Sequence, residues 1–209
     1  MEEKYRIVVQ EDFASNGVEY KKGDTVSARF ATGTGKADPY LQEKVKTPDG
    51  ERWLYKIDGG GWIQNYSCLS LTGKSWIEEE AIVCNGSVVF GDAVVKSGYV
   101  SGSTIGGEAV VEGNSKIVNS KVFGKVDSSE IHSSSVMDGG EVVGRSKVAM
   151  GSVIYGMVAD AKVADCVIYG FVGEKGCAVR STVMPDGGIK GKIVVYRSRV
   201  DGIVEEING

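Results

Sequence analysis

The residues that could act as acids, bases or metal ligands are few. His132, in SSEIHSSSV, is the only histidine, and one imidazole can act as a general base beside a substrate hydroxyl or amine. Protein zinc sites use three or four nitrogen, sulfur or carboxylate ligands, so we predict no metal site and no cofactor. No HExxH motif, nucleophile elbow or paired-carboxylate motif accompanies the histidine. We read His132 as an exposed residue of a short strand, and as catalytic only under an acyltransferase alternative.

The cysteines also lack a reactive spacing. Cys68, Cys84, Cys166 and Cys177 form no CxxC pair and have no histidine partners, so we expect free, buried thiols in a reducing compartment. The start, MEEKYRIVVQEDF, has no basic segment followed by an apolar one, and no window approaches the length of a membrane span. We therefore expect a cytoplasmic protein, or one in a host cytoplasm, without membrane association.

Charge is distributed unevenly along the chain. The net charge is −4 and the pI is near 5.2, which makes nucleic acid an unexpected partner. Residues 146–209 are more basic than residues 76–145. We interpret the late cations either as a solvated face or as a site for phosphates or nucleotides between subunits, because several Lys and Arg groups can hold a phosphate. The predicted ligand-binding residues are Lys175, Arg180, Lys190, Lys192, Arg197 and Arg199.

One stretch imitates a phosphate-binding loop. ATGTGKA at 31–37 contains Gly-Lys, but Phe30 stands at the first glycine position and Ala37 at the Ser/Thr position of the Walker pattern. We expect a surface loop.

The organising feature is a repeat between residues 76 and 204. Valine-rich pairs recur about every five or six residues, as in CNGSVV, FGDAVV and GSVIY, with no helical period. Glycine, at 30 residues, recurs at the joints, where the chain must turn sharply. Short strands on three faces, with roughly 16–18 residues per coil, predict a solenoid of about seven or eight coils. We expect an all-β protein with residues 205–209 as a C-terminal tail.

The repeat resembles the left-handed parallel β-helix of hexapeptide-repeat proteins. SKVAMGSVIYGMV and DCVIYGFVGEKGCAVRSTVMPDG, within 146–195, are most similar to the C-terminal β-helix of ADP-glucose pyrophosphorylases. That resemblance implies the fold but no catalytic residue, because the family's nucleotide-binding domain has no counterpart here. The five-residue steps depart from strict hexapeptides.

Alternation within the repeat predicts which side chains face the core. If Ala81 and Val83 point inward, Ile82 points outward, and so do Val88, Val94 and Val110. Outward apolar residues on a solenoid favour subunit packing. We therefore predict a homo-oligomer, and the family resemblance implies a trimer.

Residues 1–75 have a different pattern, typical of a small β-barrel. KKGDTV, ERWLYKI and GGGWIQNY resemble the diverging turn, the tryptophan strand and the following turn of SH3 domains. This resemblance implies a peptide-binding groove at Trp53, Trp62 and Tyr66. VVQED replaces the aromatic-rich motif of the family, Gln64 replaces its proline, and Arg52 stands where its ligand-binding tryptophan belongs. We therefore favour a structural or capping barrel.

These features together predict a non-enzymatic, oligomeric binding or structural protein. A phage-type or bacterial scaffold or host-interaction protein, able to sequester a small phosphorylated ligand between subunits, fits this description. The alternatives are a hexapeptide-repeat acyltransferase or nucleotidyltransferase relative that uses His132, and a cell-wall or peptide-binding module that uses the barrel.

Overall fold

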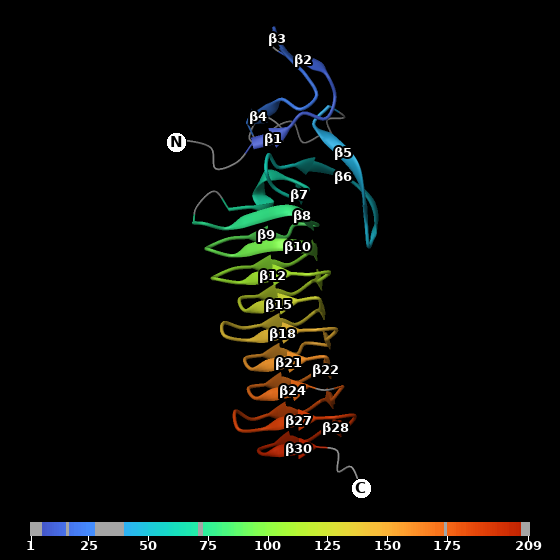
Figure 1. Ribbon diagram of the computed structural model, residues 1–209, viewed down its shortest axis with the longest axis vertical. Helices are drawn as coiled ribbons and strands as arrows, with labels where there is room; N and C mark the ends of the chain where they lie inside the picture. Colours follow the sequence, from blue (N-terminus) through green and yellow to red (C-terminus); the bar gives the residue numbers. More distant parts are fainter. Residues whose placement is uncertain (1–5, 16, 28–39, 71–72, 174, 206–209) are drawn as a thin grey trace.

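The computed structural model describes residues 6–15, 17–27, 40–70, 73–173 and 175–205. Apart from a short 3-10 helix, η1 (Tyr66–Cys68), the regular elements in these ranges are β-strands. Most of the chain winds into a parallel β-solenoid of about nine turns, visible in Figure 1 as a column of stacked coils. The all-β prediction and the solenoid are confirmed, and the predicted seven or eight coils come close to the observed number.

Short antiparallel strands precede the solenoid, and a sheet ladder connects the two parts. β7 pairs antiparallel with β6 and in parallel with β8, the first strand of the solenoid. This ladder crosses the expected boundary near residue 75. An SH3-like barrel stays a prediction. The strands are β1 (Arg6–Val8), which pairs with β4 (Thr25–Ser27), β2 (Phe13–Ser15) with β3 (Val18–Tyr20), β5 (Gln42–Thr47) with β6 (Gly50–Lys56), and then β7 (Trp62–Ile63) and β8 (Trp76–Cys84).

The solenoid has three faces, and each complete coil contributes a short strand to each. The first face consists of β9 (Val88–Val89), β11 (Thr104–Ile105), β14 (Lys121–Val122), β17 (Ser135–Val136), β20 (Val153–Ile154), β23 (Val167–Ile168), β26 (Thr182–Val183) and β29 (Arg199–Val200).

β8 and β10 (Val94–Ser101) run across both remaining faces. The second face continues with β12 (Val110–Glu112), β15 (Lys125–Asp127), β18 (Glu141–Val143), β21 (Met157–Ala159), β24 (Phe171–Gly173), β27 (Gly188–Lys190) and β30 (Ile203–Glu205). The third face continues with β13 (Lys116–Val118), β16 (Glu130–His132), β19 (Lys147–Ala149), β22 (Lys162–Ala164), β25 (Cys177–Val179) and β28 (Val194–Tyr196).

Branched apolar side chains fill the interior in columns. Val122, Val126 and Ile131, one from each face of one coil, are all 0% exposed, and each contributes roughly 1.5–3 kcal/mol through burial. Ala81 and Val83 are fully buried while Ile82 points outward, as the alternation predicted. Parallel pairing keeps equivalent residues in register from coil to coil, so the apolar columns are continuous.

A polar column runs beside the apolar ones where the third face turns into the first. The Ser103 hydroxyl oxygen accepts a hydrogen bond from the backbone N–H of Ser120 at 3.0 Å, and that of Ser120 accepts from Ser134 at 3.3 Å. These hydroxyls donate in turn to carbonyl groups two residues earlier. Cys166 takes the same place, and its sulfur accepts from the Ser181 N–H at 3.4 Å. The buried backbone groups at this corner are thereby satisfied.

The corner between the first and second faces has two lengths. Three residues join the inward side chains Val122 and Val126, whereas five join Ile105 and Val111. Every short corner has glycine in the middle, at positions 124, 156, 170 and 202. A Cβ at Gly170 would lie 2.1 Å from the carbonyl oxygen of the next coil's Gly187, which only glycine avoids. Corner length therefore varies while the faces stay in register.

Candidate functional site

His132 does not lie in a catalytic arrangement. It is half-buried at the end of β16, beside Val118 of the preceding coil. Its imidazole has no hydrogen bond or ion pair with another described residue. A general base is normally held by a hydrogen bond from a second polar group, and no described residue makes such a bond to this imidazole.

The six predicted cationic residues do not converge within one chain. Lys190 lies on the second face and Arg199 on the first, where it bonds Asp201 at 2.9 Å. Lys175 and Lys192 lie near the turn from the second to the third face, whereas Arg180 and Arg197 follow the third face. Equivalent positions in successive coils are 14 to 18 residues apart. Cations that are neighbours in the sequence therefore lie on different faces.

Two of the six do meet. Arg180 and Arg197 occupy equivalent left-handed positions in successive coils, with φ of 49° and 48°. The Arg180 guanidinium donates to the Tyr196 hydroxyl at 3.4 Å, and the Arg197 guanidinium lies 5.1 Å from the centre of the same ring. Asp165 faces Arg180 at 3.7 Å, and both side chains are more than half exposed. Two cations around a phenol ring can bind a phosphate and an adjoining flat group.

The predicted peptide-binding residues do not form one groove. Trp53 is 47% exposed on β6, whereas Trp62 on β7 packs against a small core and lies under Lys56, 5.1 Å from its Nζ atom. The two tryptophan rings make no contact with each other. Tyr66 belongs to η1, but its side chain lies outside the described part of the structure. The loop at 31–37 also lies outside the described residues.

The β5–β6 hairpin is held against the third face. Leu54 is fully buried there with Cys84 and Tyr99. The Cys84 thiol donates to the Tyr99 hydroxyl at 3.4 Å, and that hydroxyl donates to Asp49 at 2.7 Å. Lys116 approaches the same carboxylate at 3.5 Å. This arrangement, which we call the hairpin clamp, connects residues 50 positions apart.

The protonation states of its side chains preserve the hydrogen bonds of the hairpin clamp near neutral pH. Burial is the main cause that raises the pKa of Tyr99 to about 12 and raises the pKa of Cys84. The hydrogen bond from Tyr99 is the main cause that lowers the pKa of Asp49. The phenol and the thiol therefore stay protonated as donors while Asp49 stays ionised as the acceptor. A protonated, buried thiol is a poor nucleophile, so the clamp is structural.

The cysteine prediction needs one correction. All four thiols are free, and Cys68, Cys84 and Cys166 are buried. Cys177 is only half-buried, because it points outward from the third face while Ala178 fills the interior.

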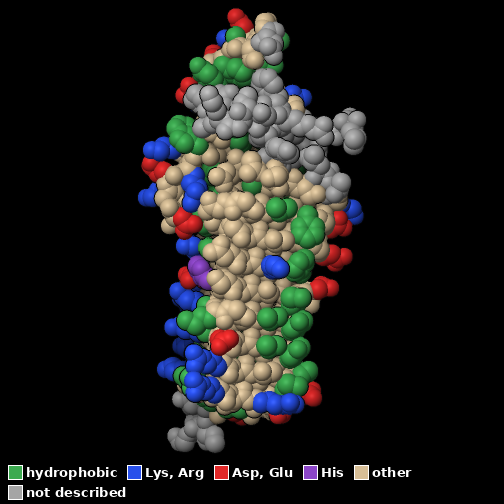
Figure 2. All heavy atoms as spheres, turned by 180° about the vertical axis from the view of Figure 1, so that it is seen from behind, with side chains coloured by type: hydrophobic (Ala, Val, Ile, Leu, Met, Phe, Trp, Pro, Cys, Tyr) green, Lys and Arg blue, Asp and Glu red, His purple; other side chains and the backbone are tan. Residues whose placement is uncertain are grey.

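A continuous exposed apolar surface lies on two successive short corners. Tyr155 and Tyr169 are 42% and 44% exposed, and their rings stack at 4.9 Å. Met157, 37% exposed, and Phe171 follow them across the glycine, and Val153 and Val167 precede them. We call these six residues the apolar edge. Figure 2 shows hydrophobic side chains in a column on one side of the solenoid, with Lys and Arg gathered on the opposite side.

This edge was not among the predicted features. The outward apolar residues predicted at Ile82, Val88 and Val94 do point outward but are half-buried. Ile82 also packs against the small core beneath the hairpin. The repeated pattern VIYGMV and VIYGFV could have revealed the edge, because tyrosine before a corner glycine leaves its ring on the outside.

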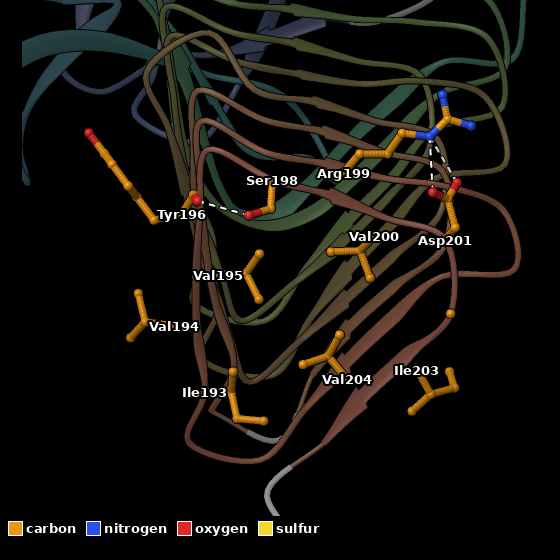
Figure 3. Close-up of a pocket in the computed structure, with 11 residues that line it drawn as sticks. Ile193, Val194, Val195, Tyr196, Ser198, Arg199, Val200, Asp201, Ile203 and Val204 are labelled. Atoms are coloured by element: carbon orange, nitrogen blue, oxygen red, sulfur yellow. Dashed lines mark hydrogen bonds and ion pairs between the residues drawn. The ribbon is translucent and has the colours of Figure 1, made fainter.

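Within the described residues, the last coil leaves a hollow at the C-terminal end of the solenoid. A hollow of about 620 Å³ is lined by the last coil, and Figure 3 shows Val195, Val200 and Val204 pointing toward the inside of that coil. Val194 and Tyr196 point away from it. This hollow exposes the last layer of the core and contains no convergent polar groups. The expected cap VEEING begins in β30, but residues 206–209 lie outside the described part of the structure.

Comparisons with known proteins supply no family: no family model and no curated protein matches the chain. Among the described residues, no helix is long and apolar enough to cross a membrane, and no group of three or more His, Cys, Asp or Glu side chains could hold a metal ion.

Proposed function

We propose that this protein is a non-enzymatic binding or structural protein that self-associates through the apolar edge. The observation that carries the proposal is the stacked, half-exposed pair Tyr155 and Tyr169 together with Met157. Exposed apolar groups gathered on one surface typically mark an interface, and aromatic residues and methionine are enriched there.

The finer parts of the proposal extend the family resemblance. We propose a left-handed, hexapeptide-type winding, an SH3-like N-terminal barrel and a homotrimer. A phage-type or bacterial scaffold or host-interaction protein of the cytoplasm is the setting that fits such an assembly. No observation on the described residues favours the acyltransferase or the peptide-binding alternative.

Self-association can be tested by replacing the stacked tyrosines. We expect sedimentation of the wild type at micromolar concentration to give an oligomer, and the Tyr155→Glu/Tyr169→Glu variant to give a monomer. Two charges placed in an apolar interface lose their hydration without gaining a partner. Met150→Glu is the matched control, because Met150 is 72% exposed and lies outside the apolar edge. A monomeric wild type, or an oligomer that survives the double substitution, would contradict the proposal.

A small anionic ligand is the second candidate function, and the arrangement of Arg180, Tyr196 and Arg197 favours it. We expect calorimetry with ADP to detect binding to the wild type. The Arg180→Ala/Arg197→Ala variant should bind at least tenfold more weakly, since a charge-assisted hydrogen bond contributes about 1.5–3 kcal/mol. Lys190→Ala, on another face, should bind like the wild type. Unchanged binding by the arginine variant would refute the site.

A further inference from the structure

A separate hollow interrupts the solenoid where one short corner lies between two long ones. The short corner is Phe123–Lys125, and the neighbouring long corners carry Gly107–Glu108 and Asp138–Gly139 at their tips. Because the middle corner is two residues shorter, the outer two overhang it. The resulting space of about 500 Å³ is lined by Gly107, Glu108, Phe123, Met137 and Asp138. We call it the corner hollow.

The floor of the corner hollow is apolar, and neighbouring side chains fix its position. Phe123 and Met137 are half-buried, and the Phe123 ring makes an edge-to-face contact with Phe90 at 6.3 Å. An aromatic contact of this kind fixes the orientation of the ring. Gly106 lies between the two rings, and a Cβ there would meet a Phe90 carbon at 2.3 Å. The floor is therefore held in place by its neighbours.

Two carboxylates flank this floor on opposite sides. Glu108 and Asp138 are exposed and have no ion pair or hydrogen bond with another described residue. The lysine of the short corner, Lys125, turns instead to Glu112 on the second face, at 3.4 Å. The carboxylates belong to coils two steps apart, which corresponds to about 9.6 Å along the solenoid. The corner hollow thus has two negative ends and an apolar middle.

We propose that the corner hollow binds an alkyl diammonium ion, a molecule with two ammonium groups joined by a short methylene chain. One ammonium pairs with Glu108 and the other with Asp138, while the methylene groups cover Phe123 and Met137. Burial of the methylene groups stabilises the complex, and each ammonium lies at an otherwise unpartnered carboxylate. A monoamine of the same length satisfies only one end, so the site selects the diamine.

The test is calorimetry at low salt with 1,4-diaminobutane, with 1-aminobutane as the monovalent comparison. We expect one diamine per chain, weaker binding of the monoamine, and weaker diamine binding as salt is raised, since exposed charges are screened. Glu108→Gln and Asp138→Asn should each reduce diamine affinity about two- to fivefold, the range of exposed ion pairs. Asp186→Asn, an exposed aspartate on another long corner, should leave the affinity unchanged.

Two further arms make the result specific. The Tyr155→Glu/Tyr169→Glu variant should still bind the diamine. This variant therefore tests the diamine site independently of the proposed self-association. Phe123→Leu should weaken diamine binding without removing either carboxylate. Equal affinity for monoamine and diamine, an equal loss in Asp186→Asn, or no diamine binding at millimolar concentration would overturn the proposal.

Discussion

A Gly170→Ala variant is expected to lose about 3 kcal/mol of folding free energy and to melt about 6–12 °C below the wild type. The added methyl carbon would lie 2.1 Å from the carbonyl oxygen of Gly187 and 2.4 Å from that of Met184. Both are backbone atoms of the next coil, so no side-chain rotation relieves the contact. Two coils must separate locally, which weakens the parallel ladders on either side of the corner. Thermal unfolding followed by circular dichroism measures the effect.

Gly202→Ala is the control for this substitution. Gly202 occupies the same middle position of a short corner in the last coil, but a Cβ there would meet nothing within 4 Å. The two variants make the same chemical change, and only Gly170 has a coil beneath it. We expect a shift below 2 °C for Gly202→Ala. Equal shifts would mean that the cost arises from the corner conformation and not from the stacking of coils.

A Leu54→Ala variant should loosen the β5–β6 hairpin. Leu54 is fully buried between the hairpin and the third face, and truncating such a leucine typically costs 2–5 kcal/mol. The cost falls on the hairpin, because the interior columns of the solenoid are unchanged. We therefore expect hydrogen exchange to accelerate at the amides of residues 42–56, while exchange in the middle coils stays slow.

Trp53→Ala serves as the matched control on the same strand. Trp53 is one residue away but 47% exposed, so its truncation should change hairpin exchange much less than Leu54→Ala does. If Leu54→Ala left hydrogen exchange in the hairpin unchanged, the hairpin clamp would not fix the N-terminal part to the solenoid.

The periodic part of the fold could be predicted from the sequence, because each coil repeats the same local rule. The inward positions of Ala81 and Val83 followed from alternation alone. The hairpin clamp could not, because Tyr99 and Asp49 lie 50 residues apart and neither has a repeating pattern. Its contact depends on how a non-repeating segment folds back on the third face.

The candidate sites were also difficult to predict from the sequence. The late cations are neighbours in the sequence, yet Arg199 and Arg197 lie on different parts of the coil, because a residue's face depends on its position within one turn. Corner length, which determines both the apolar edge and the corner hollow, is visible in the sequence only after the inward residues are assigned. Three residues between Val122 and Val126, against five between Ile105 and Val111, become meaningful once those side chains are known to be buried.

The variable corner length gives this solenoid an evolutionary route to new surfaces. A two-residue deletion at one corner, with glycine at its centre, lowers that coil's edge without shifting any buried column, as the in-register pairing around Val122 and Val126 shows. Each coil contacts only its neighbours, so such a change stays local. Hollows and edges can therefore differ from one coil to the next while the buried columns keep their register, provided that each short corner keeps its glycine.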